Sequence, residues 1–192
     1  MKLDQDINYI VSGLERSGTS LLMQILNSAD IPCAFDQSRK PDINNPKGYY
    51  ELEGGKIINK LMEKQFPFEK FKGRFIKITA YGIKFLPPGK YKILYSERDI
   101  EEIMDSMEKM AKTTDSDRKE TKKAFTNLNK SIKNQIQERE DIQHIFINYN
   151  KILTDTEQEI KKIQKYLGIP SEKIKDMVGV VDKRLYRQRR TN

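Results

Sequence analysis

The sequence predicts an α/β fold of three layers, in which helices flank a mainly parallel central sheet. Two observations lead to this prediction. Four short apolar runs rich in β-branched residues have the length of buried strands, and helical patterns alternate with them along the chain. The expected strands cover 7–12, 74–80, 91–96 and 144–149. In such folds ligands bind beyond the carboxyl ends of the strands, so the loops that follow the strands are the first place to look for a site.

The helical segments differ in the strength of their pattern. The segment 99–112 has its apolar residues on one face, which is typical of a helix packed on a sheet. The last segment ends at Gly168 before Pro170, a normal helix stop. Gly54 and Gly55 weaken the pattern of another segment. The expected helices cover 20–29, 51–66, 99–112, 116–140 and 155–168.

The length of the chain fits one domain over residues 1–192, because 192 residues suffice for one full hydrophobic core and no repeat or Ser/Gly-rich linker divides them. No run approaches the roughly 18 apolar residues of a membrane-spanning helix. The N-terminal segment carries acidic residues and no apolar signal core, so no export and a cytoplasmic location are expected. No sequence feature indicates an oligomeric state.

The net charge and the single cysteine and histidine limit the classes of function that the chain can have. There are 36 Lys and Arg against 28 Asp and Glu, a net charge of +8 that favours an anionic partner, although most lysines lie on polar helical stretches and are expected to be solvated. The single cysteine, Cys33, rules out a disulfide framework. The single histidine, His144, makes a histidine zinc site or a Ser-His-Asp triad implausible. Its place in an expected strand indicates a structural role.

The first expected strand runs into a turn with two glycines, "GLERSGTS" (13–20), and then directly into a helical pattern. Small residues let backbone N–H groups converge on an anion, and the first amides of the helix face the same point. Gly13 and Gly18 permit this close approach. The hydroxyls of Ser17, Thr19 and Ser20 add further donors.

The two glycines have the spacing of the nucleoside triphosphatase loop G-x-x-x-x-G-K-[ST], but Thr19 stands where that loop has its lysine. The lysine reaches the β- and γ-phosphates, so its absence counts against ATP or GTP hydrolysis. Arg16, inside the loop, supplies a cation instead, and its planar fork suits an anion.

With this arginine the segment "RSGTSLL" (16–22) resembles the 5′-phosphosulfate loop of sulfotransferases, which use 3′-phosphoadenosine 5′-phosphosulfate (PAPS). The second motif of that family begins with an arginine at the end of a later strand, and a serine follows eight residues on. Arg98 and Ser106 have this spacing after the strand expected at 91–96. The resemblance implies that both residues bind the 3′-phosphate of PAPS.

Further segments resemble a bacterial branch of sulfotransferase-like proteins, and the resemblance runs in order over nearly the whole chain. These segments are "NNPKGYYELE" (44–53), "INYNKIL" (147–153), "YLGIP" (166–170) and "VVDKRLYRQR" (180–189). The C-terminal Arg-Lys-Gly motif of many cytosolic members is absent. Arginines of the basic tail are the candidates to supply its cation, with Arg187 among Arg184, Arg189 and Arg190.

The resemblance implies PAPS as co-substrate and sulfuryl transfer to a small-molecule or glycan acceptor. Arg16 and the amides of Ser17, Gly18, Thr19 and Ser20 suit the 5′-phosphate and the sulfuryl oxygens. No metal is expected, because sulfate carries less charge than a terminal phosphate and no acidic metal cluster stands out.

The acceptor must lose a proton to a general base, whether it is an alcohol, a phenol or an amine. The histidine that many cytosolic members use is missing, so a carboxylate is the natural choice. Asp36, one helix and a turn after the loop, and Glu51, in "KGYYE", are equally good candidates.

Two other classes of function stay open. One is a P-loop kinase or another nucleotide-binding enzyme, which lacks here its loop lysine and an evident Mg²⁺-binding aspartate after a strand. The other is a non-catalytic module that binds PAPS, another nucleotide or nucleic acid. Nucleic acid is not expected, because stacking aromatic residues are nowhere interleaved with the basic ones.

Overall fold

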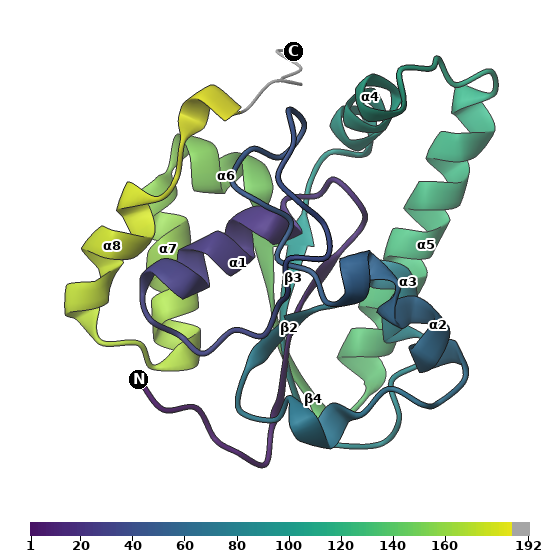
Figure 1. Cartoon of the computed structure of the whole chain (residues 1–192). Coiled ribbons are helices and arrows are strands. Elements are labelled where there is room, and N and C mark those ends of the chain that lie inside the picture. Colours follow the sequence, from purple (N-terminus) through teal and green to yellow (C-terminus); the bar gives the residue numbers. More distant parts are fainter. Residues whose placement is uncertain (186–192) are drawn as a thin grey trace.

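The computed structural model describes residues 1–185 of the chain and contains a four-stranded, all-parallel sheet in that part (Figure 1). The strand order is β2-β1-β3-β4. The strands are β1 (Asn8–Gly13), β2 (Phe75–Lys77), β3 (Tyr91–Glu97) and β4 (Ile142–Asn148). Each expected strand is therefore present, and the predicted three-layer α/β fold is confirmed. The second strand is shorter than predicted, because α3 already begins at Ala80.

Helices cover both faces of the sheet (Figure 1). Those beside α1, namely α7 and α8, lie on one face, and α3 and α5 lie on the other. The helices of the described residues are α1 (Thr19–Ser28), α2 (Ile57–Met62), α3 (Ala80–Ile83), α4 (Ile100–Ala111), α5 (Arg118–Glu138), α6 (Tyr149–Thr154), α7 (Thr156–Leu167) and α8 (Ile174–Gly179).

The strands read as continuous apolar runs because the sheet is buried on both faces. Successive side chains of a strand point to opposite faces. In β1, Val11 belongs to the core beneath α1 and α7, whereas Ile10 belongs to the core on the other face. Leu94 and Ile93 of β3 divide between the two cores in the same way. This two-sided burial fixes the position of β1 and β3, from which the loops of the site extend.

The helix expected over 51–66 is mostly absent, and this part of the prediction was wrong. Only α2 remains, because Gly54 and Gly55 adopt positive φ angles of 62° and 86°, and Glu53 has a φ of 52°. These angles interrupt the α-helix and leave a short 3₁₀ turn at Glu53–Gly55. The helix predicted near the C-terminus is confirmed as α7, which ends at Gly168 with a φ of 67°.

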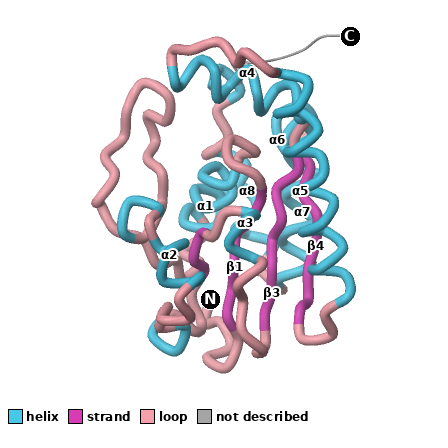
Figure 2. The backbone as a smooth tube through the Cα atoms, turned by 90° about the vertical axis from the view of Figure 1, so that its right-hand side faces the viewer, coloured by secondary structure: helices cyan, strands magenta, loops and turns pink. Residues whose placement is uncertain are grey.

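Two further features follow from the element order. β4 ends at Asn148 and α6 begins at Tyr149. The sequence predicted no helix directly after this strand. Figure 2 shows β1, β3 and β4 lying side by side, with α4 beyond one end of the sheet. None of the helices within residues 1–185 is long and apolar enough to cross a membrane.

Candidate active site

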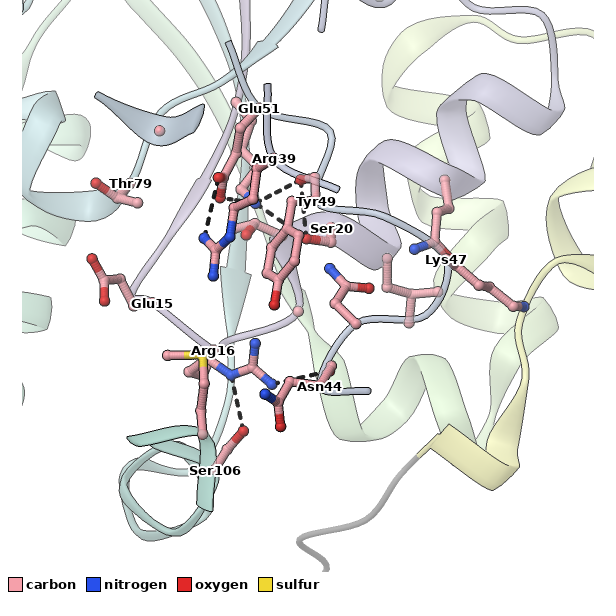
Figure 3. Close-up of a pocket in the computed structure, with 18 of the residues that line it drawn as sticks. Glu15, Arg16, Ser20, Arg39, Asn44, Lys47, Tyr49, Glu51, Thr79 and Ser106 are labelled. Carbon is pink, nitrogen blue, oxygen red and sulfur yellow. Dashed lines mark hydrogen bonds and ion pairs between the residues drawn. The ribbon is translucent and has the colours of Figure 1, made fainter. Parts of the chain in front are cut away.

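The carboxyl ends of the four strands border one cavity of about 610 Å³ (Figure 3). Each strand leads into a segment that lines it. These segments are the loop 13–20 after β1, Thr79 after β2, Arg98 after β3 and Tyr149 after β4. The cavity therefore lies where parallel α/β sheets bind ligands.

The loop after β1 is shaped by two positions that accept only glycine. A Cβ atom on Gly13, whose φ is 149°, would lie 2.6 Å from the carbonyl oxygen of Ser96. A Cβ atom on Gly18, whose φ is 104°, would lie 2.2 Å from the ring of Tyr149. Gly18 is also the N-cap of α1, and it has no side chain with which to cap the first amides of that helix. The amides are left to bind an anion.

Arg16 reaches from this loop to α4 (Figure 3). Its Nε donates to Oγ of Ser106 at 3.0 Å, and its Nη2 donates to the carbonyl oxygen of Asn44 at 3.4 Å. Burial lowers the pKa of Arg16, and an arginine remains charged at neutral pH even so. Arg16 and Ser106, which lie 90 positions apart in the sequence, are thus in direct contact at the cavity.

Arg98 binds the backbone of the loop 13–20. Its Nη1 donates to the carbonyl oxygen of Arg16 at 3.0 Å, and its Nε donates to Glu102 at 3.0 Å. The guanidinium also lies 4.6 Å from the ring centre of Tyr149. The side chains of Arg98 and Glu102 are only 6% and 2% exposed. The motif spacing did not predict the buried ion pair that Glu102 forms with Arg98.

Lys77 at the end of β2 is a second residue that the sequence analysis missed. Its Nζ donates to Oγ of Ser20 at 3.1 Å, to the carbonyl oxygen of Tyr49 at 2.8 Å and to Oε1 of Glu51 at 2.8 Å. Burial lowers the pKa of Lys77, and Glu51 partly offsets this effect. A lysine inside an apolar strand, "RFIKITA", was the available signal. The cation absent at position 19 is thus matched by a lysine that approaches the loop from the neighbouring strand.

The two carboxylates considered as general bases lie in different places. Glu51 lines the cavity and forms ion pairs with Lys77 and with Arg39, whose Nη1 lies 3.3 Å from Oε2. Asp36 is not among the residues that line the cavity. Its carboxylate accepts the backbone N–H groups of Ser38 and Glu53, and hydrogen bonds from the Ser38 side chain and from these N–H groups lower the pKa of Asp36. Glu51 therefore lies at the cavity beside the loop, whereas Asp36 stabilises a turn outside the cavity.

The remaining candidates are found as follows. The side chains of Ser17 and Thr19 are buried in the loop, and Oγ of Ser17 has no hydrogen-bond partner among the described residues. His144 lies in β4 with its ring 5.1 Å from that of Phe146. Arg187 lies outside the described residues. Within residues 1–185 there is no group of three or more His, Cys, Asp and Glu side chains that would hold a metal ion.

The fold and the cavity define an α/β protein with a glycine-shaped loop at the end of its first strand, and the free amides of this loop face the cavity. Residues 6–191 match the family described as the sulfotransferase domain, and the chain belongs to that family. No curated protein sequence matches the chain.

Two solved structures show the same fold. Mouse sulfotransferase SULT7A1 complexed with PAP aligns with a TM-score of 0.50 and 16% identity over 92% of this chain and 63% of that one. Retinol dehydratase in complex with androsterone and the inactive cofactor PAP aligns with a TM-score of 0.54 and 17% identity over 92% and 64%. The chain thus spans less than two thirds of the length of these two proteins.

Proposed function

We propose that the protein transfers a sulfuryl group from PAPS to a hydroxyl or amine group of a small-molecule or glycan acceptor. The observation that carries the proposal is the contact between Arg16 and Ser106. These residues come from the two sulfotransferase motifs, and they meet at a loop built to hold an anion. Membership of the sulfotransferase family supports the choice of donor. Placement in the bacterial branch of that family rests on the sequence segments alone.

The residues at the loop fit PAPS. The free amides at the start of α1 provide donors for a 5′-phosphosulfate. Ser106, on the face of α4 that borders the cavity, is suited to the 3′-phosphate. Arg98 is assigned to the 3′-phosphate side as well, where it also fixes the loop through the carbonyl oxygen of Arg16. The cavity, at about 610 Å³, has the size of sites that hold small molecules and cofactors.

The chemistry places negative charge on the oxygen that leaves with the 5′-phosphate. Cations held in position before the reaction stabilise that charge without the cost of reorganisation. Arg16 within the loop is the first such cation, and Lys77 beside Ser20 is the second. Glu51 keeps Lys77 and Arg39 in place through its two ion pairs. No step of this scheme requires a metal.

The acceptor has room on the side of the cavity that follows β2. Thr79 and Tyr81 line it there together with Ile58 and Met62. Met62 and Tyr81 are exposed at 49% and 44%, so their apolar surfaces are free to contact an acceptor. This side has both apolar and polar groups, which is consistent with a hydroxylated small molecule and with a sugar.

The test compares the wild type with Arg16→Ala and Arg16→Lys. Radiolabelled sulfate is offered as PAPS to a panel of alcohols, phenols, amines and saccharides, and calorimetry measures binding of 3′-phosphoadenosine 5′-phosphate (PAP) and ATP. Arg16→Ala is expected to lower kcat by about 10²–10³-fold, as does loss of one preorganised donor in other enzymes. Arg16→Lys should retain part of the activity, because the charge stays while the fork is lost.

Arg74→Ala is the matched control, since Arg74 is exposed and does not line the cavity. It should behave as the wild type. Equal affinity of the wild type for ATP and PAP would contradict the assignment of the donor. Tight binding of PAP without transfer to any acceptor would favour a non-catalytic module.

A further inference from the structure

Within residues 1–185 three carboxylates line the cavity, and two of them form ion pairs with cationic side chains. Glu51 is bound by Lys77 and Arg39. Asp182 is bound by Arg184, with Nε and Nη2 each 2.9 Å from one of its oxygens. The third carboxylate, Glu15, is exposed and has neither an ion pair nor a side-chain hydrogen bond within residues 1–185. Among the described residues, Glu15 is therefore the lining carboxylate whose oxygens are free to accept a proton.

The backbone of the loop directs Glu15 toward the acceptor side. Leu14, which precedes it, is buried at 3% exposure and anchors the chain in the core. Arg16, which follows it, has a φ of 65° and turns its guanidinium toward Ser106. In Figure 3, Glu15 lies across Arg16 from Ser106, on the side where Thr79 borders the cavity. Neighbouring residues of one loop thus serve the two sides of the site.

Three other titratable groups are poorly placed to take a proton from an acceptor. His144 lies in β4 against Phe146 and does not line the cavity. The hydroxyl of Tyr49 already donates to Asp42, and burial raises the pKa of Tyr49. Asp36 is held in its turn by two backbone N–H groups.

We propose that Glu15 is the general base that removes the proton of the acceptor hydroxyl, an inference that rests on the proposed sulfotransferase function. The proton passes to the Glu15 carboxylate as the acceptor oxygen forms its bond to sulfur. The bond between sulfur and the bridging oxygen breaks, and its electron pair leaves with PAP, whose developing charge is stabilised by Arg16. Glu15 then releases the proton to water. Base and cation are adjacent in the sequence, so a single loop conformation positions both.

The experiment uses the best acceptor from the panel and compares the wild type with Glu15→Gln, which keeps the shape of the side chain, and Glu15→Ala. General bases contribute about 10²–10⁴-fold, so kcat of Glu15→Gln should fall at least about 100-fold while its affinity for PAP stays that of the wild type. Formate or acetate should restore part of the kcat of Glu15→Ala, since a small carboxylate fits the space that the side chain leaves. Glu63→Gln, an exposed glutamate that does not line the cavity, is the control and should behave as the wild type.

The outcomes separate this inference from the function on which it rests. A wild type that binds PAP and transfers sulfate to no acceptor overturns both. An active wild type with an equally active Glu15→Gln variant overturns the role of Glu15 alone. A variant with a raised KM and an unchanged kcat also overturns it, because that pattern marks a residue that only binds the acceptor. A fall in kcat with no rescue by any small carboxylate would likewise count against proton transfer.

Discussion

The proposed donor side and the proposed acceptor side of the cavity are built in different ways. The donor side consists of two junctions between a strand and a helix, from β1 to α1 and from β3 to α4. The acceptor side is lined by Thr79 and by residues of α2 and α3, and the irregular segment 36–56 leads to it; in this segment Gly48, Tyr50 and Glu53 adopt positive φ angles of 92°, 55° and 52°. Functional residues at the ends of regular elements are readable from sequence spacing, whereas those carried by irregular segments are not.

The register of the sheet explains why the donor side is readable. β1 and β3 are parallel neighbours, and Gly13 pairs with Ser96 at their carboxyl ends. The loop after Gly13 and the start of α4 must therefore lie side by side. The contact of Arg98 with the carbonyl oxygen of Arg16 is a direct consequence.

The largest expected difference between the two sides is in the response to loss of an arginine. Arg98→Ala removes the cation that pairs with the buried Glu102 carboxylate, and breaking a buried ion pair in this way typically costs about 3–5 kcal/mol of unfolding free energy. Arg39→Ala on the acceptor side should cost about 1 kcal/mol or less, because the Arg39 side chain is 39% exposed and solvent screens its ion pair with Glu51. Urea denaturation followed by circular dichroism measures both.

The double variant Arg98→Ala with Glu102→Gln serves as the control for this pair. It also removes the negative charge at position 102 and should recover part of the lost stability. Equal losses for the two arginine variants would contradict the expectation that burial of the ion pair sets the cost of losing each arginine.

A smaller difference is expected between two glycines. Gly18→Ala on the donor side combines a φ of 104° with a contact of 2.2 Å to the Tyr149 ring, so backbone strain and overpacking add to roughly 2–4 kcal/mol. Gly54→Ala on the acceptor side has a φ of 62° and meets nothing closer than Ser38 at 3.9 Å, so strain of about 1 kcal/mol is the whole cost. Thermal unfolding of the two variants compares them directly. A Gly54 variant as unstable as the Gly18 variant would show that the acceptor segment is packed as tightly as the loop.

The sequence predicted the fold well, for reasons visible in particular residues, whereas the roles of the site residues stay predictions. Apolar periodicity located all four strands, and motif spacing selected Arg16 and Ser106, which the structure shows in contact. The ion pair of Arg98 with Glu102 was not predicted, although the two opposite charges have the i,i+4 spacing at the start of a helix.

The contacts of the irregular segment 36–56 were harder to predict because they depend on the path of the loop. Lys77 meets Glu51 only because the segment before η1 (Glu53–Gly55) folds back over the end of β2. Asp36 was selected as a candidate base by its distance along the chain from the loop. In an irregular turn this distance does not determine where a side chain lies. The roles of Arg187 and the cytoplasmic location stay predictions from the sequence.

The smallest expected effect comes from two single hydroxyls. Ser106→Ala removes the acceptor of the Arg16 Nε hydrogen bond and a donor to the 3′-phosphate, which should weaken PAP binding by about 0.5–1.5 kcal/mol. Thr79→Ala removes a hydroxyl that lines the cavity beyond β2 and makes no capping hydrogen bond to α3. Its affinity for PAP should stay that of the wild type, while KM for the acceptor rises. Calorimetry with PAP and steady-state kinetics with the best acceptor separate the two effects. If Thr79→Ala weakened PAP binding as much as Ser106→Ala does, the donor would extend across both sides of the cavity and the division between them would be wrong.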